Sequence, residues 1–149
     1  MNQIPRSALI LGLAGLMPFL WGALTVTVPS IALWGQSNLG GRFIGPYVQL
    51  FYGVIILSFM SGVLWGFATK AAGQLATASY ILSVIPALWA FVMTGGGPTT
   101  AAVNLIVGFL GLLLLDWHFW RLRLAPPWWM HLRGLLTTIV ILSMLPVVF

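Results

Sequence analysis

The side chains able to do acid–base chemistry or to bind a metal gather in one short segment, residues 116–133, with the sequence DWHFWRLRLAPPWWMHLR. We call this segment the charged cassette. It holds the only acidic residue of the chain, both histidines and half of the lysine and arginine residues. These are Asp116, His118, Arg121, Arg123, His131 and Arg133. Four tryptophans accompany them, namely Trp117, Trp120, Trp128 and Trp129. Any function that depends on a carboxylate side chain or on a histidine must draw on this segment.

Asp116 has two interpretations. A lone carboxylate within a membrane-embedded helix is a candidate for proton transfer or for binding a cationic substrate. However, Asp116 lies about 26 Å along a helix that would start at Thr99, which is near the far boundary of a bilayer, and a proton relay is expected deeper. We therefore favour Asp116 as an anchor of the following loop through Arg121, Arg123 or Arg133.

The two histidines and Asp116 do not form a recognisable metal motif. His118 and His131 lack the i, i+4 spacing of a helical ligand pair, and a structural zinc site takes four ligands. We predict no metal site. A single histidine can ligate a haem or a chlorophyll, which need only one axial nitrogen. We favour interfacial hydrogen bonding for both histidines, and we expect no cofactor of the protein's own.

No catalytic constellation is recognisable. The chain has no second carboxylate for paired acid–base catalysis and no cysteine nucleophile. No serine combines with a histidine and an acid at a known spacing. We therefore expect that the protein is not an enzyme.

The composition indicates the environment in which the cassette lies. Hydrophobic residues make up 60% of the chain and charged residues 5%, whereas about a quarter of the residues of a soluble domain are charged. The chain is therefore expected to be an integral membrane protein. The net charge of +5 does not indicate nucleic-acid binding, because the cations are separated by apolar stretches. The absence of cysteine excludes disulfides and thiolate metal sites.

Five apolar stretches predict a single all-α domain over residues 1–149, a polytopic bundle of five transmembrane helices. The predicted spans are residues 7–28, 47–69, 74–94, 99–116 and 128–149. The first would be about 33 Å long, against a hydrocarbon core of about 30 Å. Pro18 predicts a bend there. Pro86 would leave the carbonyl of Leu82 in need of a neighbouring hydroxyl or helix. Residues 35–45 are expected to form a loop, and residues 70–73 a tight turn.

The cations predict the orientation of the bundle. With five spans, every lysine and arginine except Arg42 falls on the side of the N-terminus. The positive-inside rule places that side in the cytoplasm of a bacterium or in the mitochondrial matrix. We therefore expect an inner-membrane protein, bacterial or mitochondrial, with its C-terminus on the opposite side.

Small residues and tryptophans suggest contact surfaces. Ser58, Gly62 and Gly66 follow one another at four-residue spacing beside Trp65, a pattern that allows close helix packing in lipid. We favour packing inside the bundle, with contact to a partner protein as the alternative. Asn104 is expected to hydrogen-bond to another helix. The tryptophans of the cassette predict an interfacial aromatic belt, and the cassette is interpreted as a docking platform along the membrane surface.

Three blocks of the sequence resemble a bacterial membrane family of unknown function that also includes the mitochondrial transmembrane protein 69. The blocks are residues 4–19, residues 52–68, and Asp116 followed by residues 124–140. The resemblance implies a small five-span inner-membrane protein with no established activity. It marks Pro5, Gly12, Gly15, Pro18, Tyr52, Gly53, Ser58, Gly62, Trp65, Gly66, Asp116, Pro127, Trp128 and Arg133. One departure is Leu64, where the family often carries a polar or basic residue.

From these features we expect an accessory or assembly subunit of a larger inner-membrane complex, respiratory or photosynthetic. It would act through helix packing, lipid contacts and docking, with membrane lipids and the larger complex as its partners and no nucleic acid. The alternative is a small transporter or a protein that binds a hydrophobic ligand such as a porphyrin. Pro18, Pro86 and Asp116 motivate that alternative.

Overall fold

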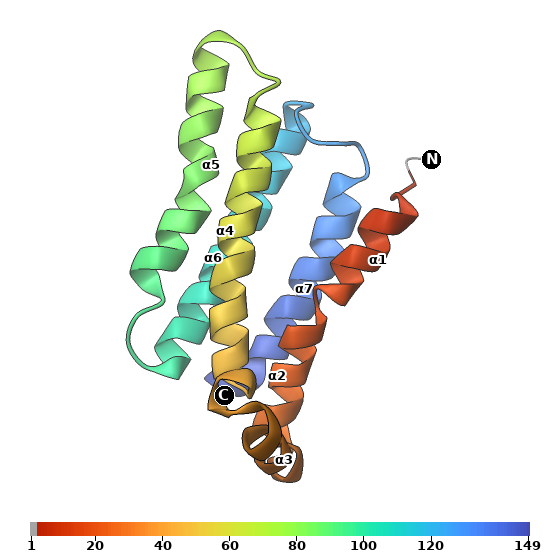
Figure 1. The fold of residues 1–149 in the computed structure, drawn as a ribbon. Coiled ribbons are helices and arrows are strands. Elements are labelled where there is room, and N and C mark those ends of the chain that lie inside the picture. Colours follow the sequence, from red (N-terminus) through yellow and green to blue (C-terminus); the bar gives the residue numbers. More distant parts are fainter. Residues whose placement is uncertain (1–2) are drawn as a thin grey trace.

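The computed structural model describes residues 3–149, and within that range the chain is helical with no strand. The elements are α1 (Arg6–Ala14), α2 (Met17–Thr27), α3 (Pro29–Leu39), η1 (Gly41–Phe43), α4 (Tyr47–Ala68), α5 (Gly73–Met93), α6 (Pro98–Arg121) and α7 (Trp129–Val148). In the described part of the chain, five helical stretches are long and apolar enough to cross a membrane, with α1 and α2 together forming the first. The start of α1 and the C-terminus lie at opposite ends of the bundle (Figure 1). The predicted fold class is confirmed.

The first span is broken between α1 and α2, as Pro18 predicted. The N–H of Leu16 bonds to the carbonyl of Leu13, three residues back, instead of continuing the α-helical pattern. Pro18 then lies in the first turn of α2, where a missing N–H is tolerated. Below this break α2 packs against both α4 and α7, whereas α1 leans outward and packs chiefly against α7 (Figure 1). The break therefore separates the upper part of the first span from α4.

The loop expected over residues 35–45 is partly wrong, because residues 35–39 belong to helix α3. Pro29 begins this helix at a position where its fixed φ is favourable. The helix continues through Gly35 and ends at Gly40, whose φ is 88°. The indole of Trp21 donates a hydrogen bond of 2.7 Å to the carbonyl of Phe43 and thereby holds the segment after α3 against the bundle.

The tight turn after α4 produces the antiparallel hairpin of α4 and α5 that the sequence predicted. Within α5, Pro86 interrupts the backbone hydrogen bonding. The hydroxyl of Ser61 on α4 lies beside this site and accepts a 2.9 Å hydrogen bond from the N–H of Ala87. It therefore pairs with an N–H group next to Pro86 and not with the carbonyl of Leu82 that was expected to need a partner. Asn104 on α6 donates a 2.7 Å hydrogen bond to the carbonyl of Met93 at the end of α5, so its expected bond to another helix is formed.

The core lies where α2, α4, α6 and α7 meet. Its largest fully buried apolar side chains are Phe19, Leu57, Leu64, Leu105, Phe109, Leu112, Phe119 and Met144. Gln49 is buried among them, and its side-chain nitrogen donates to the carbonyls of Phe19 and Ser143, at 2.9 and 2.8 Å. One side chain of α4 therefore ties α2 to α7.

Helix α6 is longer than predicted. It continues past the expected end at residue 116 to Arg121, because residues 117–121 contain no glycine or proline. The chain then turns at Arg123, where φ is 59°, and the N–H groups of Leu124 and Ala125 both point to the carbonyl of Phe119. The interpretation of the cassette as one surface platform is therefore wrong, since its first part extends α6 and its last part begins α7.

Candidate functional site

An ion pair joins the end of α6 to the start of α7. Oδ2 of Asp116 lies 2.6 Å from Nε of Arg133. The indole N–H of Trp129 donates to the other carboxylate oxygen, Oδ1, at 2.7 Å. The side chain of Asp116 is fully buried, and that of Arg133 is only 6% exposed. Of the arginines named from the sequence as partners of Asp116, the structure selects Arg133.

The sequence explains why these three residues meet. Trp129 and Arg133 are four residues apart at the start of α7 and therefore share one face of that helix. Residues 122–128 fold back over the end of α6, with Leu124 and Ala125 buried. Lys70 from the α4–α5 turn holds this loop, since its ammonium group donates a 2.9 Å hydrogen bond to the carbonyl of Leu124. Both oxygens of Asp116 are thus engaged, and the carboxylate is held rigidly.

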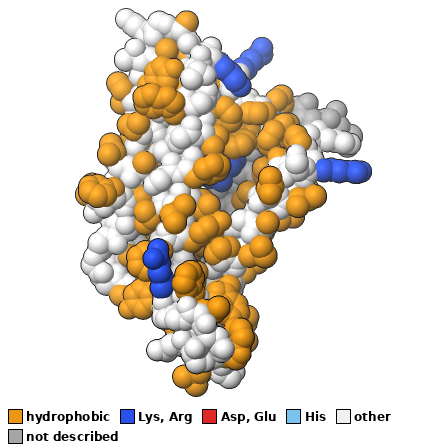
Figure 2. Space-filling view, viewed as in Figure 1, with side chains coloured by type: hydrophobic (Ala, Val, Ile, Leu, Met, Phe, Trp, Pro, Cys, Tyr) orange, Lys and Arg blue, Asp and Glu red, His pale blue; other side chains and the backbone are white. Residues whose placement is uncertain are grey.

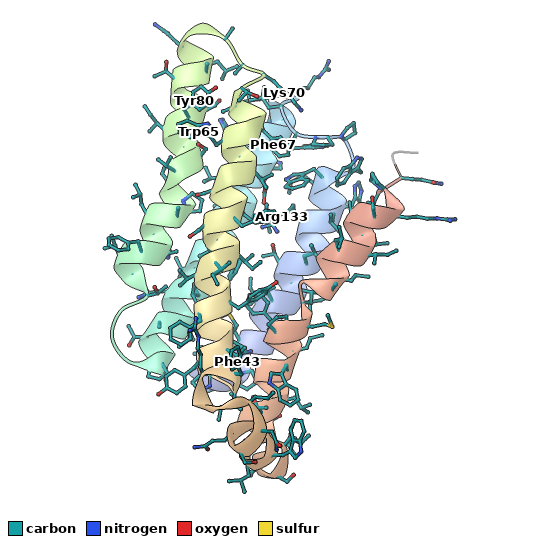
Figure 3. The ribbon with its side chains drawn as sticks, viewed as in Figure 1. Phe43, Trp65, Phe67, Lys70, Tyr80 and Arg133 are labelled. Carbon is teal, nitrogen blue, oxygen red and sulfur yellow. The ribbon has the colours of Figure 1, made fainter. Side chains whose placement is uncertain are left out.

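Arg133 also forms part of the wall of a cavity of about 610 Å³ between α1, α4 and α7. We call it the α1/α4/α7 cavity. Most of its wall is apolar, including Leu16, Phe19, Ile56, Val63, Leu136 and Val140. Figure 2 shows a blue side chain at the bottom of a hollow among apolar side chains, at the place where Figure 3 labels Arg133 between α4 and α7. The break after α1 keeps this space open.

Two buried polar atoms in the wall of the cavity have no protein partner among residues 3–149. They are Nη2 of Arg133 and Oγ1 of Thr137, which lies one turn further along α7. Arg133 uses only its Nε toward Asp116. A guanidinium carries five N–H donors, so most N–H groups of Arg133 do not bond to the carboxylate of Asp116. Tyr52 and Trp128 add further polar groups to the wall.

The four tryptophans of the cassette do not form one belt. Trp117 and Trp120 lie on the outer side of α6 and are 46% and 37% exposed. Trp128 and Trp129 are half-buried and line the cavity. The belt interpretation therefore fits Trp117 and Trp120 and is wrong for Trp129, whose indole is bonded to Asp116.

The remaining residues of the cassette lie outside the ion pair. His118, Arg121, Arg123 and His131 are all exposed. The guanidinium of Arg121 lies 4.8 Å from the centre of the Trp117 ring, a cation–π contact on the surface. Within residues 3–149, no three histidine or acidic side chains come together as metal ligands. The charged cassette is thus divided into a buried ion pair, Asp116 with Arg133, and four exposed basic side chains.

The small-residue stripe of α4 faces outward, so the favoured interpretation that it packs inside the bundle is wrong. Ser58, Gly62, Trp65 and Gly66 are exposed, and no atom of the described chain lies within 4 Å of a Cβ placed at Gly62 or Gly66. The inner face of α4 is formed instead by Gly53, Leu57, Met60, Ser61, Leu64 and Ala68. The four-residue spacing of these small residues shows that they share one face of the helix. It does not show whether that face points into the bundle or outward.

Sequence reasoning missed two polar residues of the interior. Gln49 ties three helices together, and Thr137 places a hydroxyl in the cavity. The available signal for Gln49 was its amide within an otherwise apolar span, since polar side chains in membrane helices usually face the bundle. No comparable signal distinguished Thr137 from its exposed neighbour Thr138. Of the positions marked by the resemblance, Gly12, Gly15, Tyr52, Trp128 and Arg133 line the cavity.

The fold and the buried ion pair define the class as a multi-pass α-helical membrane protein. The chain belongs to the family described as protein of unknown function, DUF3429, whose model matches residues 4–149. It is 33% identical over 153 residues to transmembrane protein 69 of Xenopus tropicalis, a match that covers 97% of this chain and 54% of that protein. The mouse protein, transmembrane protein 69 of Mus musculus, is 29% identical over 144 residues, covering 93% of this chain and 54% of the relative.

The resemblance drawn from the three sequence blocks is thereby confirmed. The chain spans about half the length of these relatives. No solved structure matches the chain.

Proposed function

We propose that this protein is a non-catalytic accessory or assembly subunit that docks onto a larger membrane complex through the outward face of α4. The observation that supports this proposal is the exposure of Ser58, Gly62 and Gly66 on one side of the helix. In lipid, apolar side chains alone provide little drive for association, and small residues promote it by allowing backbones to approach closely. Inside this bundle the glycines of the stripe have no such role, because within residues 3–149 no atom of another helix lies within 4 Å of a Cβ placed at Gly62 or Gly66.

Large apolar side chains border the stripe. Phe59 is 64% exposed and Trp65 is 48% exposed, and the Trp65 ring is held by Tyr80 of α5 with ring centres 4.6 Å apart. Figure 3 labels these two rings where α4 and α5 lie side by side. A partner helix could fit against the glycines between these side chains. The stripe and its aromatic border therefore have the composition of a helix-docking surface.

As the location we propose a bacterial inner membrane or the mitochondrial inner membrane, with the N-terminus in the cytoplasm or the matrix. Arg6, Lys70, Arg121 and Arg123 lie toward one end of the spans and Arg42 toward the other. The partner we propose is a respiratory or photosynthetic complex, since these are the large energy-transducing assemblies of such membranes.

The test is a pull-down of the tagged full chain from its native membrane in mild detergent, followed by mass spectrometry and an absorption spectrum. We expect a stoichiometric set of complex subunits with the wild-type chain. Gly62→Leu and Gly66→Leu should lose them. Gly111→Leu is the matched control, because Gly111 of α6 is also exposed and no atom of another helix in residues 3–149 lies within 4 Å of its added Cβ. A wild-type protein that purifies alone would contradict the proposal, as would equal behaviour of all three variants.

A second candidate function is the binding of a hydrophobic ligand, and the observation in its favour is the α1/α4/α7 cavity. The transporter form of this alternative relied on Asp116 as a proton carrier. That carboxylate is bonded on both oxygens, to Arg133 and to Trp129, so binding is favoured over proton-coupled transport. Asp116→Asn should then leave any flux of the reconstituted protein unchanged in its pH dependence. Because this variant removes one partner of the buried ion pair, it must first be shown to be folded; loss of proton-coupled flux in the folded variant would restore the transporter alternative.

A further inference from the structure

We infer that the α1/α4/α7 cavity binds an apolar molecule that ends in a neutral carbonyl oxygen, and that Arg133 and Thr137 bind this oxygen. The inference deepens the second candidate function and rests on it. Two membrane components carry this chemistry, a prenylated quinone and the acyl ester of a glycerolipid. The argument rests on the free donors, on the charge of the site and on the shape of the cavity.

The donors are already oriented before any ligand binds. Arg133 is 6% exposed in its side chain and is fixed by Asp116 through Nε alone. Its buried Nη2 has no acceptor within residues 3–149, and neither has the hydroxyl of Thr137. Both groups line the same cavity from successive turns of α7. A buried donor without an acceptor is costly, so this arrangement favours a ligand that supplies an acceptor.

The charge of the site selects the kind of acceptor. Asp116 and Arg133 together carry no net charge, and among the described residues no other lysine, arginine, histidine or acidic side chain lines the cavity. A carboxylate or a phosphate would bring a second anion close to Asp116, within a region of low dielectric where repulsion is strong. A carbonyl oxygen accepts from Arg133 without adding charge. A neutral polar end is therefore favoured over an anionic one.

The wall and the depth of the cavity suit the rest of such a molecule. The volume of about 610 Å³ lies within the range of about 300 to 1,000 Å³ found for small-molecule sites. Leu11 and Phe59, which are 71% and 64% exposed, lie at its rim and leave a route for an apolar tail into lipid. Arg133 is four residues from the start of α7, about 6 Å along the axis. That depth is close to the boundary between headgroups and hydrocarbon, where a carbonyl end would lie.

The experiment uses the purified full-length protein in mild detergent. Decylubiquinone is titrated while tryptophan fluorescence is recorded, because Trp128 and Trp129 line the cavity. Methyl dodecanoate, an ester, and dodecane, which has no carbonyl, are then compared as competitors. In parallel, organic extracts of the protein are analysed by mass spectrometry. We expect saturable quenching that methyl dodecanoate reverses at least about tenfold more effectively than dodecane, the scale of one hydrogen bond to a charged donor.

The variants separate the polar contact from the cavity. Arg133→Lys keeps the charge beside Asp116 but removes the planar fork, and should weaken decylubiquinone binding by about tenfold or more. Thr137→Val leaves the ion pair intact and should weaken binding several-fold. Val63→Phe fills the cavity and should weaken quinone and ester alike. The matched controls are Arg121→Lys, Thr138→Val and Val107→Phe, at exposed positions outside the cavity, which should bind as the wild type does.

The outcomes distinguish this inference from the function on which it rests. A stoichiometric quinone in the extract would identify the quinone as the natural ligand, and a stoichiometric glycerolipid would identify the ester; either supports the inference. If Val63→Phe abolishes binding while Arg133→Lys and Thr137→Val bind normally, the carbonyl contact is overturned and the ligand-binding function stands. If quenching is not saturable and neither molecule is retained, both are overturned.

Discussion

Asp116 and Arg133 form an ion pair inside the helix bundle, with Oδ2 and Nε 2.6 Å apart. The two residues come from different helices, one near the end of α6 and one near the start of α7. Because each neutralises the other, the bundle carries no net charge at this depth, and the desolvation cost of each group is offset by its partner. The pair also fixes how α6 and α7 cross and, through that crossing, one wall of the cavity.

Removing one partner of this pair should destabilise the protein strongly. Arg133→Gln leaves the carboxylate of Asp116 buried with only the Trp129 indole as a donor, and the loss expected for breaking a buried pair is about 3 to 5 kcal/mol. The measurement is unfolding of the purified protein by SDS titration. Arg123→Gln is the control, since Arg123 is exposed and a surface change of this kind costs no more than about 0.5 kcal/mol.

The double variant Asp116→Asn with Arg133→Gln should recover much of the lost stability, because no uncompensated charge remains. Equal stability of the Arg133 single variant and the wild type would contradict the buried pair.

Gly22 is required by the close approach of Gln49. A Cβ at this position would lie 2.2 Å from Cγ and 2.7 Å from Cδ of Gln49. The Gln49 side chain would have to move, and its hydrogen bonds to α2 and α7 would break. Gly22→Val should therefore cost at least about 1 to 3 kcal/mol, the usual range for overpacking, measured by the same titration. Gly111→Val should show a smaller loss, because in the described part of the chain no other helix has an atom within 4 Å of its added Cβ. Equal losses would argue against this packing.

Ser61 of α4 bonds to α5 next to Pro86. Its hydroxyl accepts the hydrogen bond of the Ala87 N–H, so Ser61→Ala leaves that donor without this acceptor. The expected cost is about 1 kcal/mol, in line with hydrogen bonds between membrane helices, read from the midpoint of unfolding. Ser58→Ala serves as the control because Ser58 lies on the outer face of the same helix. The role given to Ser61 fails if both variants unfold at the same midpoint.

Much of this fold follows from the sequence because the membrane imposes a simple pattern on it. Apolar stretches of sufficient length must be helices, since backbone groups have no other partners in lipid. The spans, the short α4–α5 turn and the bend near Pro18 were therefore predictable. Helix α3 was not, because its glycine and polar residues are equally typical of loops, and only the stop at Gly40 shows where the helix ends.

The candidate site was predictable only in part. Three arginines lie near Asp116 in the sequence, so the sequence limited the candidates for its partner to these three. It could not choose Arg133 among them, because the pair forms only when α7 returns beside α6. The direction of the α4 stripe was wrongly predicted for a related reason. In lipid, the inner and the outer face of a helix are both apolar, so Gly62 and Gly53 have similar surroundings in sequence and opposite positions in the bundle.

The proposed orientation can be read directly, since the chain contains no cysteine and any single introduced cysteine reports on one position. Asn38→Cys, at the exposed end of α3, lies on the side of Arg42. Gln74→Cys, at the exposed start of α5, lies on the side of Lys70. With the cation-rich side in the cytoplasm, a membrane-impermeant maleimide applied to intact bacterial spheroplasts should label Asn38→Cys at once and Gln74→Cys only after permeabilisation. The reverse pattern would show that the cations do not set the topology, and labelling of both positions in intact spheroplasts would contradict a membrane crossing by α4, the one span between them.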